Sequence, residues 1–187
     1  MGFFFGINTI MSALDNQPSN KNLLSPLGFK FVLNKISTCN YFSYNVSVPT
    51  LSLGDFDTEN PFLRLPYTGD KLRYEPFNIT FRVDEDLQNY LEIHNWLVSL
   101  GYPENFGQSA HDGVASGSAF KNKNVFSDGK LYIMSSNKNP SLEITFRDMF
   151  PMGITELSFD ATLNDVDYLT ATATFRYAIY TIKKLPN

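Results

Sequence analysis

The fold is decided by residues Thr68–Leu100, which read TGDKLRYEPFNITFRVDEDLQNYLEIHNWLVSL. The stretch opens on a Gly-Asp pair at residues 69–70, which predicts a turn. Residues 77–83 then alternate apolar and polar side chains, so that Phe77, Ile79 and Phe81 fall on one face of a predicted strand. Beyond this strand the spacing of the apolar residues changes from that of a strand to that of a helix.

The predicted helix follows an acidic turn and ends at a glycine. Asp84 is a candidate N-cap, and the carboxylates of Glu85 and Asp86 lie where the helix dipole is positive. Gly101 suits the position after the last turn, and Pro103 prevents continuation. We expect this helix to pack against a sheet or a neighbouring subunit. The positions at helical spacing are Leu87, Tyr90, Leu91, His94, Trp96, Leu97 and Leu100.

Length and composition favour a single aromatic-rich domain. A chain of 187 residues buries roughly 70% of its unfolded surface in one core. The single cysteine, Cys39, has no internal partner for a disulfide. Aromatic residues make up 15% of the chain and charged residues 18%, below the roughly 25% typical of soluble domains. Sparse charge suggests that partners cover part of the surface, although an ordinary β-rich monomer is the alternative.

The charge and the apolar runs exclude two classes of protein. A net charge of −4 argues against a protein that reads nucleic-acid sequence, since such proteins carry a basic patch. No apolar run reaches the length of a transmembrane helix. Residues 1–7 are apolar but lack a basic region and a cleavage site, so we expect no signal peptide.

Further strands are predicted on both sides of the central stretch. Met149–Gly153 is expected to interrupt the chain between two of them. The last alternates without a break over a length well beyond the usual strand of about five or six residues. The predicted strands cover residues 28–33, 41–48, 131–133, 142–146, 154–159 and 169–182.

Two of these regions are candidate interfaces. Residues 51–65 carry much apolar surface in a segment too long for a tight turn, which a hairpin projecting onto another subunit would explain. A loop folded back on its own domain is the alternative. The candidate ring-stacking residues are Leu51, Leu53, Phe56, Phe62 and Leu65. The candidates for extending a sheet from subunit to subunit are Leu169, Ala171, Ala173, Phe175 and Tyr177.

The sequence divides into an arm and one domain. Residues 1–25 begin apolar and become polar, which predicts an N-terminal arm that docks on its own domain or on a neighbouring subunit. Residues 26–187 form the single predicted domain. Within it, residues 101–128 are rich in Gly, Ser, Asn and Lys and predict a long surface loop.

Reactive chemistry is not indicated by any motif. His94 suits packing on the helix and His111 lies in the loop, and neither has the spacing of a zinc site. Residues 55–59 begin like a calcium loop but lack its central glycine and its bidentate glutamate. A thiol site at Cys39 is a remote alternative. We therefore expect no catalytic residue, no metal and no cofactor, and the protein is not expected to be an enzyme.

Taken in order, several motifs resemble the contractile-phage tail-tube family of the T4-like myoviruses. In that family a Gly-Asp-(Lys/Arg) turn precedes a strand, an acidic pair and a helix that ends near a tryptophan. Here these features are Gly69-Asp70-Lys71, Asp84-Glu85-Asp86 and Trp96. The resemblance extends from about Ser25 to Ile182. Its C-terminal motifs are Asp128-Gly129-Lys130-Leu131, Phe150-Pro151, Leu157-Ser158-Phe159-Asp160 and Ala171-Thr172-Ala173-Thr174-Phe175-Arg176-Tyr177.

The resemblance implies a mainly β (α+β) fold: a small β-barrel or orthogonal β-sandwich with one flanking helix and long inter-subunit loops. Members form hexameric rings that stack into a tube inside a sheath. The implied partners are copies of the chain and the sheath, baseplate and tail-terminator proteins, without membrane insertion. Phage DNA would pass through the lumen without specific binding, which suits a negative chain. The implied location is the virion tail, assembled in the host cytoplasm.

Alternatives remain open within and outside this family. The chain is alternatively a baseplate ring that initiates the tube or a tail-end ring, which the long loop at residues 101–128 favours, or the tube of a secretion system. From a different class, a monomeric β-barrel would bind a small apolar ligand or a glycan with its aromatic side chains. A ligand barrel needs space inside, whereas a ring subunit needs apolar residues on two opposite edges.

Overall fold

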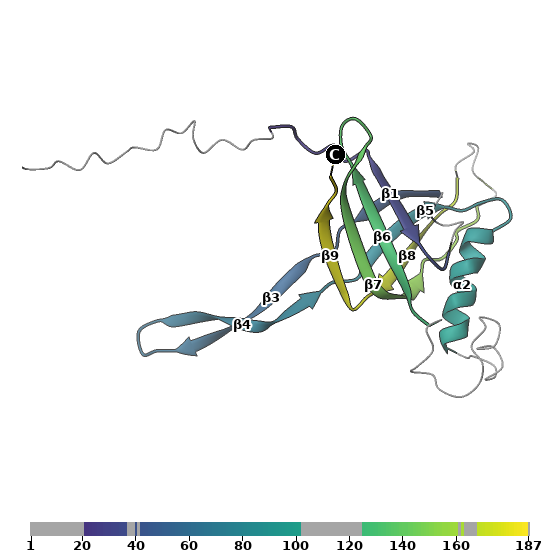
Figure 1. Cartoon of the computed structure of the whole chain (residues 1–187). Coiled ribbons are helices and arrows are strands. Elements are labelled where there is room, and N and C mark those ends of the chain that lie inside the picture. The colour runs from purple at the N-terminus through teal and green to yellow at the C-terminus, as the bar shows by residue number, and fades with distance from the viewer. Residues whose placement is uncertain are drawn as a thin grey trace, which may run out of the picture.

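A computed structural model of the chain describes residues 21–36, 40, 42–101, 125–160, 162 and 168–186. Figure 1 shows an antiparallel β structure with a helix at one end and a long hairpin at the other. The strands are β1 (Phe29–Leu33), β2 (Ser43–Ser47), β3 (Leu51–Glu59), β4 (Arg64–Tyr74), β5 (Phe77–Arg82), β6 (Ser127–Met134), β7 (Pro140–Ile154), β8 (Thr170–Arg176) and β9 (Ile179–Lys184), and the helix is α2 (Gln88–Gly101).

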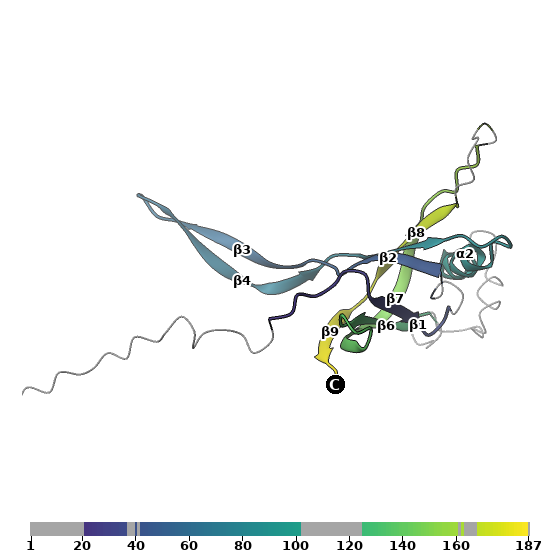
Figure 2. The same ribbon diagram turned by 90° about the horizontal axis from the view of Figure 1, so that it is seen from above.

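Strand β7 connects two layers of the sheet. The strands lie in the order β1-β6-β7-β8-β5-β2, and β9 also pairs with β7. Residues Leu142–Arg147 of β7 pair with β9, whereas Phe150–Ile154 pair with β8. Because β7 belongs to both groups, β1, β6 and β9 lie in one layer, and β2, β5 and β8 lie in the other (Figure 2).

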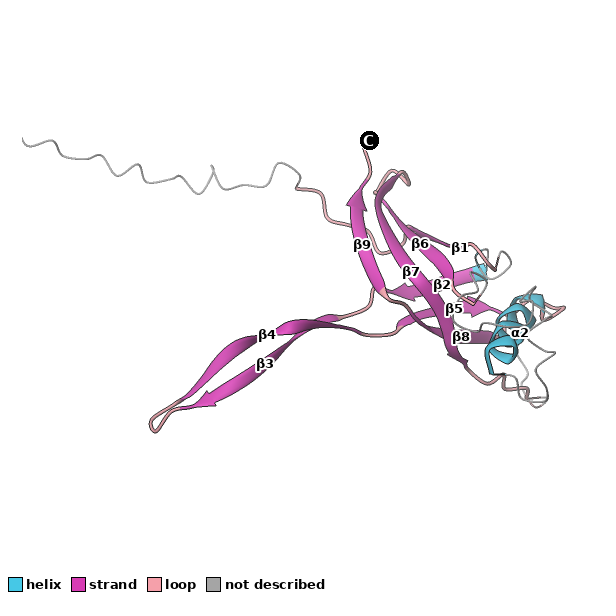
Figure 3. Cartoon of the chain, turned by 60° about the horizontal axis from the view of Figure 1, so that its bottom comes forward, coloured by secondary structure: helices cyan, strands magenta, loops and turns pink. Residues whose placement is uncertain are grey.

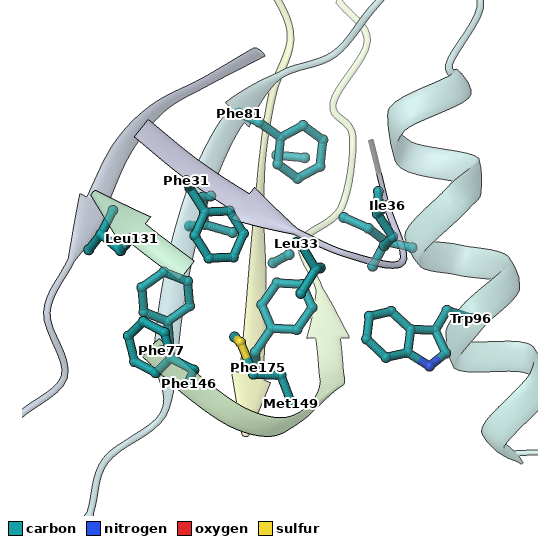
Figure 4. Packing of buried hydrophobic residues seen from close by; sticks show 14 of the residues in the cluster. Phe31, Leu33, Ile36, Phe77, Phe81, Trp96, Leu131, Phe146, Met149 and Phe175 are labelled. Atoms are coloured by element: carbon teal, nitrogen blue, oxygen red, sulfur yellow. The ribbon is translucent and has the colours of Figure 1, made fainter. Parts of the chain in front are cut away.

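The core between the layers is rich in phenylalanine. The ring centroid of Phe77 on β5 lies 5.2 Å from that of Phe31 on β1 and 4.8 Å from that of Phe146 on β7. Rings from both layers therefore interlock (Figure 4). Each such ring is fully buried, which stabilises the fold by about 1.5–3 kcal/mol per side chain. For the residues that the structure describes, the expected mainly β fold with a flanking helix is confirmed.

Helix α2 closes one end of this core. Ile93 and Trp96 are buried, and the Trp96 ring lies 6.1 Å from the Phe175 ring. The indole N–H of Trp96 donates to the Val125 carbonyl at 3.1 Å. Trp96 also lies beneath the Lys35 ammonium, which is 4.8 Å from the ring centroid. The apolar face of the helix thus packs within its own chain.

The helix begins later than the sequence predicts, because Asp84 first caps a turn. The Leu87 N–H donates to the Asp84 carbonyl at 3.0 Å, and Leu87 adopts a left-handed conformation with φ of 57°. The Leu87 carbonyl then accepts a hydrogen bond from the Leu91 N–H at 2.9 Å. Asp84 and Asn89 are joined by two further hydrogen bonds. The Asn89 N–H donates to the Asp84 carboxylate at 3.3 Å, and the Asp84 N–H donates to the side-chain oxygen of Asn89 at 3.4 Å.

Strand β7 runs through the segment predicted as a break, so the separate strand expected at residues 154–159 is wrong. Phe146 and Met149 are both buried although they lie three positions apart. Between them Asp148 has a φ of 53°, and the register with β6 shifts at this point. The Asp148 N–H donates to the Asp128 carboxylate at 3.1 Å. A bulge therefore changes the phase of the alternation without ending the strand.

The single long strand predicted at residues 169–182 is also wrong, because the chain divides there into β8 and β9. Phe175 is buried from β8, whereas in β9 Tyr180 pairs with the buried Phe146. The residues that face the core therefore change from odd-numbered positions in β8 to even-numbered positions in β9. The division lies at Tyr177 and Ala178, and the Ala178 N–H donates to the Arg147 carbonyl at 3.0 Å.

Asn89 ties the start of α2 to the end of β5 and gives a direct test of this junction. Its side chain is fully buried, and its amide donates to the Arg82 carbonyl at 2.7 Å. Asn89→Ala leaves two backbone groups without their partner, so we expect a loss of about 1–3 kcal/mol in the free energy of unfolding, measured in urea. Asn95→Ala on an exposed position of α2 should change it by less than about 0.5 kcal/mol. Equal losses in the two variants would contradict a structural role for the Asn89 amide.

Candidate assembly interface

The hairpin of β3 and β4 projects from the body of the molecule (Figures 1 and 3). Its strands form a two-stranded sheet of their own. The ladder of β2 and β5 ends at Ser47 and Asn78, and the Glu75 N–H then donates to the Thr50 carbonyl at 3.1 Å before the β3–β4 ladder begins. The two pairs form one long ribbon, half in the sheet and half outside it. The alternative of a loop folded back on the domain is therefore wrong.

Large apolar side chains are exposed along the whole hairpin. Phe62 in the turn is 96% exposed, and Phe56 on β3 is 57% exposed. Exposed apolar residues gathered on one element are typical of a contact site. The structure brings all the predicted ring-stacking residues onto this one element, and their contact with another subunit stays a prediction. The exposed set is Leu51, Leu53, Phe56, Phe62, Leu63, Leu65, Tyr67 and Leu72.

The apolar residues change from one local face of the hairpin to the other near its middle. Leu53 pairs with Leu72 in the half next to the body, and Phe56 pairs with Tyr67 in the outer half. The rings of Phe56 and Tyr67 stack at 5.7 Å. Since successive residues of a strand point to opposite sides, the apolar positions of β3 pass from odd to even numbers along the hairpin.

An acidic row occupies the other local face of the outer half. Asp55, Asp57 and Glu59 alternate along β3, so their carboxylates share one side at intervals of about 7 Å. Carboxylates spread along an extended strand do not converge on a single cation. Within the described ranges, no cluster of three His, Cys, Asp or Glu side chains has the geometry to hold a metal ion. The row is a charged strip beside the apolar one.

Two glycines approach closely where the face changes. The predicted turn at Gly69-Asp70 is wrong, because both residues lie inside β4. The register shifts there, so that residues 69–71 of β4 oppose only Gly54 of β3. A Cβ added to Gly69 would lie 2.5 Å from the Gly54 carbonyl oxygen, whereas a Cβ on Gly54 would meet nothing within 4 Å. The sequence needs glycine at position 69 for a close backbone approach.

The predicted sheet-extension residues lie on and beside β8, which is an inner strand of the sheet rather than a free edge. Strand β8 pairs with β5 on one side and with β7 on the other, which leaves it no free edge for a neighbouring subunit. Ala171, Ala173 and Phe175 are buried in the core, and Leu169 and Tyr177 are half-buried. These residues build the interior of their own chain.

Within the described part of the chain, strand β9 offers a free edge that sequence reasoning missed. It pairs with β7 on one side, and its exposed apolar residues are Ile179 and Ile182. The signal was present as a one-residue change in the alternation after Tyr177, which looked like an unbroken pattern because Ile179 continues the apolar residues at odd positions.

Two further predicted contact segments lie largely outside the described residues. Of the predicted arm at residues 1–25, the structure describes only residues 21–25, and of the predicted loop at residues 101–128 it leaves out residues 102–124. Leu23 and Leu27, at the start of the described chain, are more than nine-tenths exposed.

Comparison with solved structures identifies several chains of similar fold. A chain of the six-fold symmetrised baseplate of the anti-feeding prophage matches with a TM-score of 0.61 and 12% identity, covering 88% of this chain and 97% of that one. The tube-terminating cap of the same particle matches with a TM-score of 0.55 and 13% identity over 94% and 100%. A chain of the sheath–tube complex of an extracellular contractile injection system, PVC, matches with a TM-score of 0.53 and 12% identity, covering 88% of this chain and 94% of that one.

These similarities lie in the fold. No protein-family model matches the sequence, and no curated protein matches it. The chain therefore shares its fold with tube-related chains of contractile injection systems broadly, at an identity of 12–13%. This neighbourhood is wider than the T4-like phages whose tube proteins the sequence motifs resemble.

The close approach of the two glycines predicts unequal effects of one substitution. Gly69→Ala places a methyl group against the Gly54 carbonyl and should open the ladder at the bulge, which amide hydrogen exchange would detect as loss of protection in the hairpin. Gly54→Ala, which meets open space, should leave that protection unchanged. Because the hairpin lies outside the core, the free energy of unfolding of both variants should stay within about 0.5 kcal/mol of the parent's. Equal exchange in the two variants would contradict the close approach.

Proposed function

We propose that this protein is a structural subunit of a contractile tail, a tail-tube protein whose copies form hexameric rings that stack around a lumen. The observation that carries the proposal is the projecting hairpin, whose apolar residues have no cover within the described chain. On a fold shared with tube-related chains, such a hairpin suits contact with the next ring. The proposed ring-stacking residues are Leu51, Leu53, Phe56, Phe62 and Leu65.

The proposed partners follow from the same arrangement. They are other copies of the chain, a sheath around the tube, and the baseplate and terminator at its ends. The proposed cargo is phage DNA, which passes without being retained. A net charge of −4 supports passage, because each phosphate neutralised by a lysine or arginine would add affinity. The proposed location is the virion tail, after assembly in the host cytoplasm.

For contacts within a ring, the free edge of β9 is better placed than β8. Ile179 and Ile182 are exposed on β9, and an edge strand is ready to pair with a strand of another chain. Residues Leu169–Tyr177, the original candidates, would then act indirectly, by fixing β8 in the core from which β9 continues.

A ring that initiates or ends the tube is the second candidate. It is favoured by the likeness to chains from a baseplate and from a cap as well as from a sheath–tube complex. A ligand-binding barrel has less support, because rings from both layers fill the interior. A pocket of about 520 Å³ lies outside the core and is lined by residues 22–24, the β6–β7 turn, the start of β7 and Lys184.

Electron microscopy of the purified protein, with its mass from light scattering, tests the proposal. Long hollow tubes of stacked six-fold rings would support a tube subunit. Single rings that never stack would support the initiator or terminator. A strict monomer at high concentration in all salt conditions would overturn both.

A charge at the tip of the hairpin should separate folding from assembly. Phe62→Asp removes an apolar side chain that touches solvent in the free subunit, so the melting temperature should hardly change while tube growth is blocked. Asn60→Asp is the matched control, because it adds the same charge to the same turn and removes no apolar surface. Normal tubes from Phe62→Asp, seen by negative-stain microscopy, would overturn the assignment of the hairpin, and a block by both variants would attribute the effect to charge alone.

A further inference from the structure

The hairpin leaves the body at a junction where few backbone hydrogen bonds join its two chain segments. Pro49 and Pro76 flank the junction, and neither has an N–H with which to extend the ladder. Across it the Glu75 N–H donates to the Thr50 carbonyl at 3.1 Å. A two-stranded ribbon without a third layer is marginally stable in water. The direction of the hairpin therefore depends on contacts made beside the ladder.

A cluster of aromatic rings supplies such contacts. Tyr74, the last residue of β4, lies edge-on to Tyr177 at 6.0 Å and 73° and to Tyr180 at 5.5 Å and 79°. Tyr177 and Tyr180 pack in turn against Phe146, with centroids 5.1 and 5.9 Å away. Phe146 is fully buried. The rings thus form a continuous packed path from the core to the root of the hairpin.

Tyr177 adds a directional contact to this path. Its O–H donates to the Glu75 carbonyl at 2.9 Å, which links residues 102 positions apart. Ring contacts tolerate sliding, whereas a hydrogen bond weakens steeply when its angle changes. Tyr177 is itself fixed at the corner between β8 and β9, where the next residue, Ala178, bonds to the Arg147 carbonyl. One side chain therefore joins the two-layer body to the hairpin.

We propose that Tyr177 is a positioning residue: through its hydrogen bond to Glu75 and its contact with Tyr74, it holds the hairpin in one direction in the free subunit and so prepares it for capture by a second copy of this chain. The capture part rests on the proposed function, and the direction part does not. A hairpin already held in one direction loses less conformational freedom on binding than a swinging one.

The surroundings of Tyr177 keep its phenol neutral and able to donate. Burial, followed by Tyr180, Tyr74 and Glu75, raises the pKa of Tyr177 to about 12. An unfolded tyrosine has a pKa of about 10. The folded arrangement is therefore favoured fully below pH 10, and this contribution is lost as the pH rises from 10 to 12. Besides these three groups, the cluster contacts Phe146 of β7, which does not titrate.

An absorbance titration isolates this phenol. The difference between the parent and Tyr177→Phe should be one phenolate that appears with a midpoint near pH 12. A midpoint near pH 10 would show a solvated phenol and would contradict the burial of Tyr177 in the aromatic cluster.

Distances between spin labels test the direction of the hairpin in the free subunit. One label is placed at Asn60→Cys in the hairpin turn and one at Asn95→Cys on the exposed side of α2, in a Cys39→Ser background. Tyr177→Phe removes only the hydroxyl and should broaden the distance distribution. Tyr180→Phe is the matched control, because Tyr180 offers its ring to Tyr74 and its hydroxyl is not needed for that contact. It should leave the distribution narrow.

The assembly experiment uses the same substitutions in protein without spin labels. The concentration at which tubes or rings form should rise about fivefold in Tyr177→Phe, which corresponds to about 1 kcal/mol, and stay unchanged in Tyr180→Phe. A narrow distribution in Tyr177→Phe would overturn the positioning role. A broad distribution with an unchanged assembly concentration would overturn the preparation for capture. A parent that never assembles would refute the proposed function, and the distances would still decide the direction of the hairpin.

Discussion

The double pairing of β7 is the constraint on which the rest of the molecule depends. Its first part shares hydrogen bonds with β6 and β9 and its last part with β8, and the bulge at Asp148 changes its phase between them. One continuous strand thereby serves two layers, and the chain that follows it must turn at Tyr177 in order to pair with both parts. The interlocked rings of Phe31, Phe77 and Phe146 are the consequence, because the shared strand brings the inner faces together.

The same corner explains why the hairpin has a defined root. The ribbon of β2–β3 and β4–β5 keeps one register from Ser47 to Leu53, so its inner half is anchored by the core and its outer half is not. At the boundary, the aromatic path through Tyr177 meets the ribbon at Tyr74. Folding energy is therefore concentrated in the two layers, and the apolar residues of the hairpin contribute little to the stability of the free subunit. Exposed apolar residues of this kind suit the proposed contact with another subunit.

The sequence predicted elements wherever one period held from end to end. Strand β5 follows clean alternation, and the unusual apolar content of residues 51–65 predicted a projecting hairpin. Helix α2 was predicted as an element, but Leu91 and His94 of its expected packing face are exposed, and the buried Ile93 lies outside the expected set. Prediction failed where a local irregularity changed the phase. The bulge at Asp148 looked like the end of a strand, and the shift after Tyr177 was hidden by Ile179, which continues the apolar residues at odd positions. Gly69 resembled a turn glycine, since the need for a close backbone approach is not visible without its partner Gly54. The expected sheet extension through residues 169–177 did not foresee that β8 is paired on both sides, because strand order is a long-range property.

The weak outer half of the hairpin has a consequence for assembly. A two-stranded ribbon becomes stable when a third strand or a packed layer covers one face, and the outer half has only its cross-strand pairs, such as Phe56 with Tyr67. A second copy that covered those rings, as proposed, would remove apolar surface from water and would also complete the layer that the ribbon lacks. Local stability is lowest where such contacts are fewest, so the proposed interface lies on an element with little packing of its own. If the root of the hairpin holds its direction, the outer half is free to adjust its twist to the surface that covers it. The inner half would then orient the hairpin, and the outer half would adapt to the partner.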